Sequence, residues 1–439
     1  MHQIEISSDR LISALLRHAE GRSLCLLDSC GVGRPGSNRL IAGIDPVDVI
    51  AIREADPDKA LRIFDDELGR DDTAAIFTIS YDLGAQMNGL SQTQSAASEP
   101  DIFIALFEGV IVHDYGTGDT LVDGNRDAYE DIVESLKGQP DTYSPRPCDF
   151  WGKVVARSNF SRSAYLAAIE EIQELIRIGE TYQTNLTQQL TVPLGKGRSA
   201  TSVFLNLREM HPAPFAAYID RGSSIVVSAS PEQFIEVETE NGRRKITSSP
   251  IKGTRPRGTD ETSDATLRAE LLSSEKDRAE NKMIVDLMRN DLGRICEYGS
   301  VTVTELCRLE AHPTLFHLVS TIEGDLRPGV SYADMMRAVF PCGSITGAPK
   351  IRTMEIIERI EPDPRGLPMG AIGYRLPAGM TGEDEQFEMS VAIRTMVIKD
   401  GSAVFNVGGG VVIDSDPGQE YDESLLKARA LLNALGVTG

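Results

Sequence analysis

The sequence lacks the features that mark membrane proteins, exported proteins and zinc–thiolate proteins. No run of apolar residues approaches the roughly 18 needed for a transmembrane helix. The amino terminus, MHQIEISSDR, has no basic start followed by an apolar block, so no signal peptide is expected. The six cysteines form no CxxC pair, and no HExxH motif occurs. These absences predict a cytoplasmic protein with reduced thiols and no zinc.

The chain is also short of positive charge. It carries 44 Lys and Arg against 66 Asp and Glu, which gives a net charge of −22. Such a protein does not favour binding to a nucleic-acid backbone, and no basic stripe interleaved with aromatic residues is present. An anionic ligand would therefore need a site whose local positive charge outweighs the negative electrostatic potential of the whole protein.

Length and turn content suggest two parts of the chain. The 439 residues suffice for two domains or for one large composite core. Residues 113–155 contain turn-rich pieces such as DYGTGDT and KGQPDTYSPRPCDF. We therefore expect an N-terminal region of residues 1–150 and a second region of residues 151–439, which carries the motifs described below.

Two segments of the second region carry clear local signals. Residues 161–178 are expected to form a helix with Ser161 as its N-cap and Gly179 as its stop. The pair Asp400-Gly401 predicts the turn of a β-hairpin within FEMSVAIRTMVIKDGSAVFNVGGGVVI.

The segment PIKGT, residues 250–254, places Lys252 directly before a glycine in a loop after a β-like stretch. A lysine can act as a nucleophile once it loses its proton. Because the pKa of a free lysine is about 10.4, this use requires burial or a cationic neighbour. A solvated lysine in a turn is the ordinary alternative.

Glu280 lies on an apolar helical stripe. In RAENKMIVDLMRNDLGRI it shares a face with Met283, Ile284 and Leu287. A carboxylate in such a place is costly unless it is paired, protonated or bound to a metal. Pairing with an arginine such as Arg294 and binding of a metal are both open at this point.

A last helix is expected to begin at Asp416-Pro417, with the aspartate as cap. Glu423 and Lys427 fall on one side of it, and an exposed ion pair is the simplest explanation for them. The apolar stripe is expected on the opposite side and consists of Tyr421, Leu425, Ala428, Leu432 and Leu435. The preceding strand contains Gly408, Gly409 and Gly410, which indicates either a bulge or a close approach of the backbone to a ligand.

Three further residues are candidates with ordinary alternatives. Arg394 would alternate with apolar residues on a strand and could clamp a carboxylate, unless it is a surface arginine. Glu232 ends the strand SSIVVSAS and could act as a general acid with a raised pKa, unless it is a turn residue. His317 lies in an apolar run, where a satisfied core histidine is at least as frequent as a catalytic one.

Taken together, residues 155–435 resemble the chorismate-binding enzymes, and the resemblance is fainter over residues 1–150. It rests on these motifs in this order: GETYQTNLTQ (179–188), SPEQF (230–234), PIKGTRPRG (250–258), ENKMIVDLMRNDLGR (280–294), FHLVSTIEG (316–324), GSITGAPKIRTMEIIE (343–358), IGYR (372–375), FEMSVAIRTM (387–396) and GGGVVIDSDP (408–417). The resemblance implies an α+β fold. Its two large, mostly antiparallel β-sheets pack as a sandwich with helices outside, and residues 1–150 contribute to them.

Within this family, position 252 separates the branches. The lysine of PIKGT is characteristic of the aminodeoxychorismate synthase component I branch, whereas the anthranilate, isochorismate and salicylate synthases typically have a small residue there. The resemblance therefore implies amination of chorismate at C4, which supplies p-aminobenzoate and folate. Gln183 stands where isochorismate-forming relatives carry a water-activating lysine, which further disfavours water as the nucleophile.

The resemblance also implies a role for each candidate. Glu280 and Glu423 are expected to bind Mg²⁺, which would orient the ring carboxylate of chorismate. Glu232 would protonate the leaving C4 hydroxyl while Lys252 adds at C2, and ammonia would then add at C4 and expel the lysine. The remaining residues are expected to bind the substrate or line its pocket: Gly253, Thr254, Tyr374, Arg394, Lys427, Gln183, His317, Thr346 and the backbone of Gly408, Gly409 and Gly410.

Two segments bear on a second ligand. Some relatives carry a tryptophan pocket built from an LLxS and a PFS segment. Here Ser29, Pro214 and Phe215 fit, whereas Ala216 does not, so the sequence leaves tryptophan binding open. Cys342 also departs from the family pattern, because a glycine is common at this place in FPGGSITGAPK.

The ammonia is expected to come from a separate glutamine amidotransferase subunit, since no convincing Cys-His-Glu glutaminase arrangement is present. Two other functions compete with C4 amination. One is that of anthranilate synthase component I, which aminates chorismate at C2. The other is that of a non-catalytic subunit that binds chorismate or tryptophan, and the intact set of Lys252, Glu232, Glu280 and Glu423 argues against it.

Overall fold

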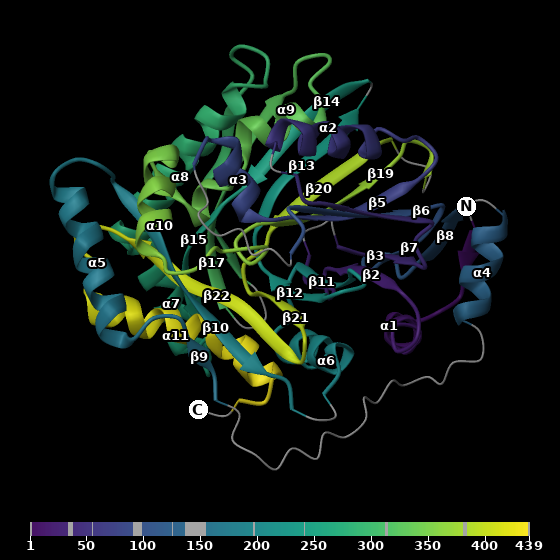
Figure 1. The fold of residues 1–439 in the computed structure, drawn as a ribbon, viewed down its shortest axis with the longest axis horizontal. Coiled ribbons are helices and arrows are strands. Elements are labelled where there is room, and N and C mark those ends of the chain that lie inside the picture. Colours follow the sequence, from purple (N-terminus) through teal and green to yellow (C-terminus); the bar gives the residue numbers. More distant parts are fainter. Residues whose placement is uncertain are drawn as a thin grey trace.

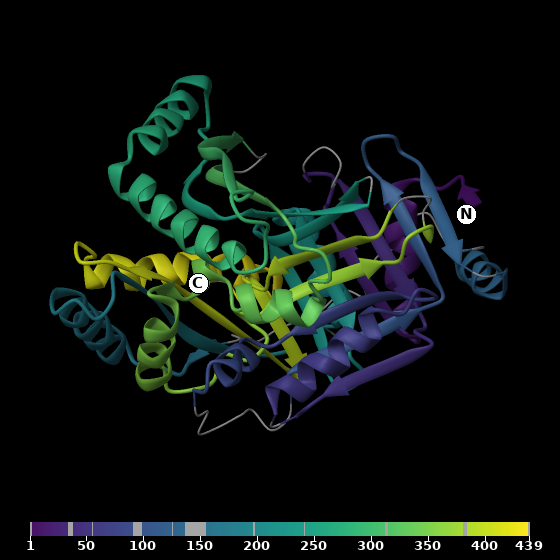
Figure 2. The ribbon, with the colours of Figure 1, turned by 90° about the horizontal axis from the view of Figure 1, so that it is seen from above.

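The computed structural model shows two large β-sheets that pack face to face, with helices on the outer faces (Figures 1 and 2). It describes residues 2–33, 38–54, 56–90, 99–124, 126–136, 155–195, 198–240, 242–311, 315–380 and 384–437. All strand pairs within the sheets are antiparallel. The expected α+β class and sandwich arrangement are confirmed. No helix in these ranges is long and apolar enough to cross a bilayer.

The first sheet has 12 strands. β9 (Arg157–Ser158) pairs with β10 at one edge. The order of the others is β1 (His2–Ile4), β8 (Thr120–Gly124), β7 (Gly109–Asp114), β3 (Arg39–Ile44), β2 (Leu24–Asp28), β11 (Phe215–Asp220), β12 (Ile225–Ser230), β21 (Thr395–Lys399), β22 (Ser402–Val411), β10 (Gln183–Pro193) and β18 (Gly347–Ala348).

The second sheet has 10 strands. β16 (Thr302–Ala311) pairs with β17 but is not part of the linear strand order. The order of the others is β15 (Ile251–Pro256), β17 (Leu315–Asp325), β14 (Arg243–Ser249), β13 (Gln233–Glu240), β20 (Gln386–Val391), β19 (Ala371–Leu376), β5 (Ala74–Ile79), β6 (Ile102–Phe107) and β4 (Asp48–Ile52).

Apolar clusters cover both faces of each sheet. Between the sheets, side chains such as Val226 of the first sheet and Ile76 of the second belong to one buried cluster. The helices outside the first sheet are α1 (Ser8–His18), α4 (Arg126–Leu136), α6 (Ala200–Met210) and α11 (Pro417–Ala434), with α5 (Arg162–Arg177) and α10 (Lys350–Ile360) over β10. Those outside the second sheet are α2 (Pro57–Leu68), α3 (Tyr81–Met87), α7 (Glu261–Ser273), α8 (Glu275–Gly293) and α9 (Tyr332–Val339).

Strands from the first 124 residues take part in both sheets. β2 pairs with β11 in the first sheet, and β5 pairs with β19 in the second. The boundary expected at residue 150 falls within residues 137–154, outside the described part of the chain.

The expected local signals form as their chemistry requires. The Ser161 hydroxyl accepts a hydrogen bond from the Ala164 N–H at 3.1 Å and caps α5, which ends at Arg177. Asp400 and Gly401 both have positive φ, 48° and 72°, and close the β21–β22 hairpin. Asp416 accepts from the Gln419 N–H at 2.9 Å and caps α11.

Two expectations about orientation need correction. In α11, Ala428 and Leu435 of the expected apolar stripe are buried, and Glu423 and Lys427 form an exposed ion pair as expected, but Leu425 is 36% exposed. The buried side instead includes Glu420, Ser424, Leu431 and Ala434. This helix lies over the glycine-rich end of β22, where polar side chains fit. Arg394 does not lie on a strand either: β20 ends at Val391, and the chain crosses from the second sheet to the first through Arg394, whose φ is 48°.

Candidate active site

Glu232 lies at the junction of β12 and β13 and is 4% exposed. Its Oε1 accepts a weak hydrogen bond from the Ile251 N–H at 3.5 Å. Burial raises the pKa of Glu232 to about 7, although a hydrogen bond from the Ser344 hydroxyl and the charge of Lys252 act to lower it. A carboxyl group with this pKa holds a proton near neutral pH, as a general acid requires.

Lys252 lies in β15 beside this carboxyl group. The pairing of β15 with β17 shifts register between Ile251 and Thr254, and Gly253 within this bulge has φ of 87°. A side chain at Gly253 would also approach Asp277, so glycine is required there. Lys252 is partly buried, and its charge acts on Glu232, Glu280 and Glu423. The structure thus brings four residues together that lie in four separate segments of the sequence.

The next strand supports this bulge. Thr254 pairs with His317 of β17, and the Thr254 hydroxyl lies 2.9 Å from His317 Nδ1. His317 is 3% exposed. These two residues therefore form a polar contact at the base of the Lys252 strand.

Glu280 of α8 and Glu423 of α11 both lie within the field of Lys252 and Lys276. Burial raises the pKa of Glu280, and the charges of Lys252 and Lys276 oppose this. Burial would also raise the pKa of Glu423, but Lys427, 2.8 Å away, together with Lys276 and Lys252 holds it below its usual range. Of the two alternatives left open for Glu280, pairing with Arg294 is not seen among the described residues, and Arg294 donates to the Ala338 carbonyl.

Sequence reasoning missed two members of this cluster, Lys276 and Glu420. Lys276 Nζ lies 4.0 Å from Glu280 Oε1 and 3.5 Å from Glu420 Oε1, so it bridges α8 and α11. Lys276 precedes Glu280 by four residues and Glu420 precedes Glu423 by three. That spacing places each beside its partner on one helix face, which is the signal that could have revealed them.

The triple glycine lies where α11 approaches β22. Gly408, Gly409 and Gly410 pair with Thr187, Leu186 and Asn185 of β10. Lys427 Nζ donates to the Gly408 carbonyl at 3.0 Å, and a Cβ on Gly409 would lie 3.3 Å from both Glu420 and Lys427. A Cβ on Gly408 would strike the β10 backbone. The glycines therefore permit a close approach of backbone, acid and amine.

Gln183 and Thr346 line the same end of β10. A Cβ on Gly410 would strike the Gln183 side chain, which is fully buried, and neither of its amide atoms has a partner among the described residues. An unpartnered buried amide is costly, so it is a candidate for contact with a ligand. The Thr346 hydroxyl instead donates to the Cys342 and Gly343 carbonyls and is satisfied within its own loop.

Arg394 occupies the crossover next to Glu232. The Val391 N–H donates to the Glu232 carbonyl, and the Arg394 carbonyl accepts from the Ala229 N–H, each at 3.0 Å. Burial lowers the pKa of Arg394, and no carboxylate among the described residues pairs with its guanidinium. It therefore remains a candidate for binding an anionic ligand.

Tyr374 lies in a different place from the one expected. It lines a cavity with Ser29, Pro214 and Phe215, and with the charged residues Arg39, Asp28 and Glu388. The reason is strand alternation: Ile372 and Tyr374 point from β19 into the space between the sheets. The assignment of Tyr374 to the Lys252 site is therefore corrected. The residues assigned to a tryptophan pocket do share one cavity.

Glu280 and Glu423 fit a hard divalent cation by their chemistry, since Mg²⁺ takes one or two carboxylates and completes its shell with water and ligand oxygens. In the described ranges, no three His, Cys, Asp or Glu side chains form a group able to hold a metal alone. Oxygens of the substrate and of water would therefore have to complete the shell.

If Glu280 and Glu423 hold Mg²⁺ as the resemblance implies, Glu280→Gln should weaken Mg²⁺ binding by on the order of 10-fold or more, because it would remove one of two charged candidate ligands. Titration calorimetry with Mg²⁺ alone measures this without any need for turnover. Asp286→Asn on the same helix is the control, since Asp286 is 76% exposed and pairs with Arg289. Equal affinity in Glu280→Gln and the wild type would remove Glu280 from the metal site.

Comparison with known proteins identifies the family and a solved structure of the same fold. The family model for chorismate binding enzymes matches residues 28–433. "Aminodeoxychorismate synthase component 1" of Bacillus subtilis strain 168 is 32% identical over 99% of this chain and 96% of its own length. "Aminodeoxychorismate synthase" of Streptomyces pristinaespiralis is 46% identical over 62% of this chain, but the match spans only 36% of that longer protein.

The fold has a solved counterpart. The crystal structure of anthranilate synthase component I from Streptococcus pneumoniae TIGR4 superposes with a TM-score of 0.75 at 26% identity, and the match covers 94% of this chain and 92% of that one. Fold, motif order and the full-length relative agree, so the chain belongs to the chorismate-binding enzyme family.

Proposed function

We propose that the chain is a component I of aminodeoxychorismate synthase and aminates chorismate at C4, for p-aminobenzoate and folate synthesis. One observation carries the proposal: the buried acid Glu232 accepts a hydrogen bond from the Ile251 N–H, next to Lys252 in the chain, and lies within the field of the Lys252 charge. A general acid and a nucleophile are the two groups that displacement of a ring hydroxyl requires. The relative from Bacillus subtilis that spans nearly the whole chain carries the same name.

The proposed reaction has two displacements. In the first, the Lys252 amine, once it has lost its proton, forms a bond to C2, both ring double bonds shift, and the C4–O bond breaks. Glu232 gives its proton to the departing oxygen, which leaves as water. In the second, ammonia forms a bond to C4, both double bonds shift back, and the C2–N bond breaks to release Lys252 as the amine. The proton that ammonium loses in giving ammonia restores Glu232. Two conjugate steps thus replace one difficult substitution.

The other residues would bind the substrate and set its orientation. Mg²⁺ held by Glu280 and Glu423 would neutralise the ring carboxylate when bound. Lys427 and Arg394 supply positive charge for the substrate carboxylates, against the net charge of −22. Gln183 offers its unpartnered amide at the β10 end of the site.

Product analysis tests the proposal. With chorismate, ammonium and Mg²⁺, the proposed enzyme forms 4-amino-4-deoxychorismate, whereas anthranilate synthase chemistry forms anthranilate, which is fluorescent. The second outcome would overturn the proposal, because amination would then occur at C2, where Lys252 is proposed to bind. A protein that binds chorismate without turnover would support the non-catalytic alternative.

A glutaminase partner is also proposed, as the name "component 1" of the Bacillus subtilis relative suggests. We expect the purified chain to turn over chorismate with ammonium but not with glutamine, and to use glutamine once a glutamine amidotransferase subunit is added. Glutamine-dependent activity from the chain alone, in a single size-exclusion peak, would refute this.

A further inference from the structure

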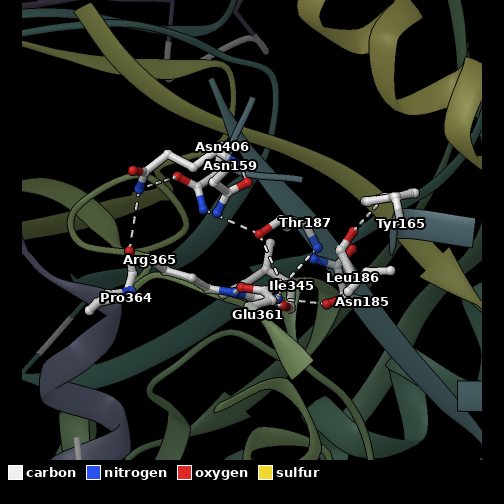
Figure 3. A network of polar contacts seen from close by, with 11 residues as sticks. Asn159, Tyr165, Asn185, Leu186, Thr187, Ile345, Glu361, Pro364, Arg365 and Asn406 are labelled. Atoms are coloured by element: carbon white, nitrogen blue, oxygen red, sulfur yellow. Dashed lines mark hydrogen bonds and ion pairs between the residues drawn. The ribbon is translucent and has the colours of Figure 1, made fainter. Parts of the chain in front are cut away.

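A buried ion pair lies behind the candidate site, in the segment between α10 and β19 (Figure 3). The side chains of Arg365 and Glu361 are only 2% and 4% exposed. Arg365 Nε donates to Glu361 Oε2 at 2.9 Å and Nη2 to Oε1 at 2.7 Å, so the carboxylate is held at both oxygens. None of the roles proposed above uses this pair.

The guanidinium also donates to two backbone carbonyls from different parts of the fold. Nη1 binds the Ile345 carbonyl at 2.7 Å, and Nη2 binds the Asn185 carbonyl at 2.6 Å (Figure 3). Glu361 Oε1 in turn accepts from the Thr187 N–H at 2.7 Å and from the Thr187 hydroxyl at 3.0 Å. The pair thus joins β10 to the 3-10 turn η1 (Gly343–Ile345).

Both tethered segments carry residues of the candidate site. Ile345 lies between Ser344, which hydrogen-bonds to Glu232, and Thr346, whose carbonyl accepts from the Asn185 N–H at 2.8 Å. Asn185 lies two residues after Gln183 and opposite Gly410. We call the Arg365–Glu361 pair the clamp, and the paired ends of β10 and β22 that carry Gln183 and Gly408–Gly410 the β10–β22 cradle. Through Ile345 the clamp supports the turn beside Glu232, and through Asn185 it supports this cradle.

The clamp also reaches the N-terminal region. The Arg365 guanidinium lies over the Tyr81 ring of α3, 4.6 Å from its centre. The Tyr81 N–H donates to the Gly366 carbonyl at 2.9 Å, and the Gly366 N–H donates to Asp82 at 3.1 Å. Helix α3 therefore fixes the loop that presents the arginine.

We propose that Arg365, held by Glu361, is a positioning residue that sets the spacing between the β10–β22 cradle and the η1 turn beside Glu232. The inference rests on the proposed function of that site. Stability alone does not require such a pair, because a protein in which apolar residues of similar volume replace a buried ion pair is often equally stable. A planar group that binds two carbonyls and a carboxylate at once provides a fixed geometry that lysine cannot provide.

The test compares Arg365→Lys with Arg375→Lys. Arg375 is equally buried, at 2%, and binds Glu385 at 3.0 Å and the carbonyl of Arg70, none of which belongs to the site. Both substitutions are expected to lower the unfolding temperature to a similar degree. Only Arg365→Lys is expected to reduce kcat, by at least about 10-fold. It should also move the pH limb of activity, which is the fall in kcat expected as Glu232, with its pKa of about 7, loses its proton. Arg375→Lys should retain kcat within about twofold.

The pH limb is the decisive readout, because loss of stability alone would not move it. Among the described residues, the charged or titratable groups that act on Glu232 or are acted on by it are Lys252 on β15 and Cys342 beside Ser344, and both variants leave them in place. If Arg365→Lys does not fold, Glu361→Gln replaces it in the test. This variant keeps the shape of the acceptor but loses its charge, and it should move the pH limb of activity in the same direction by a smaller amount.

Equal kcat and equal pH limbs in the Arg365 and Arg375 variants would overturn the inference. Turnover is followed as chorismate consumption, so the comparison holds whichever product forms. A wild type that produces anthranilate would contradict the proposed function. The comparison of the Arg365 and Arg375 variants would still show whether Arg365 is a positioning residue.

Discussion

Lys252→Ala is expected to lower kcat with chorismate and ammonium by on the order of 10³-fold or more. The substitution removes the group proposed to bond to C2, and loss of a covalent nucleophile typically removes most of an enzyme's rate advantage. Because KM reflects mainly the carboxylate contacts of the other residues, we expect it to change far less. Steady-state kinetics with ammonium as the nitrogen source measures both values.

Two control variants separate a covalent role from an electrostatic one. Lys252→Arg keeps a positive charge near Glu232, Glu280 and Glu423 but cannot act as the nucleophile, so it should be as inactive as the alanine variant. Lys245→Ala, which removes a lysine paired with Glu323 at the protein surface, should leave kcat unchanged. Substantial activity in Lys252→Arg would show that the residue acts through its charge alone.

Glu232→Gln is expected to lower kcat by on the order of 10²- to 10⁴-fold, the usual contribution of a general acid. In the wild type, burial raises the pKa of Glu232 to about 7, so the protonated form is present below that pH and is lost above it. Activity should therefore fall as the pH rises through about 7. The residual activity of the glutamine variant should lack this limb.

The same carboxyl group should affect stability with a definite sign. Its folded pKa of about 7 lies above the ordinary value of 4.5, so folding favours the protonated form, and stability is lost as the pH rises from about 4.5 to 7. Above pH 7, Glu232→Gln should therefore be more stable than the wild type, by roughly 3 kcal/mol. Urea unfolding at pH 5 and pH 8 measures this difference. A wild type as stable as the variant at pH 8, or an activity limb below pH 5, would contradict the assignment.

The sequence predicted those parts of the fold that local chemistry decides. The α5 cap at Ser161, the turn at Asp400-Gly401 and the α11 cap at Asp416 each depend on a few neighbouring residues, and each forms as expected. The buried face of α11 was not predictable in this way. Glu420 is buried because Lys276 of another helix and a glycine-rich strand lie against it, and no apolar periodicity encodes that contact.

The candidate site shows the same division. Motif order pointed to Lys252, Glu232, Glu280 and Glu423, which the fold brings together from four segments. Tyr374 was misplaced, because the direction of its side chain depends on strand alternation within the second sheet. Arg365 gave no signal at all, since both its role and its partners appear only when β10, η1 and α3 meet.

Intact-protein mass spectrometry with chorismate and Mg²⁺ but without ammonia tests the central claim most directly. The proposed mechanism predicts that the wild type gains the mass of chorismate less one water, on the peptide containing Lys252. Lys252→Ala should gain nothing, and added ammonium should remove the adduct from the wild type. A wild type that turns over chorismate yet forms no adduct, or an adduct that persists in Lys252→Ala, would contradict covalent catalysis by this lysine.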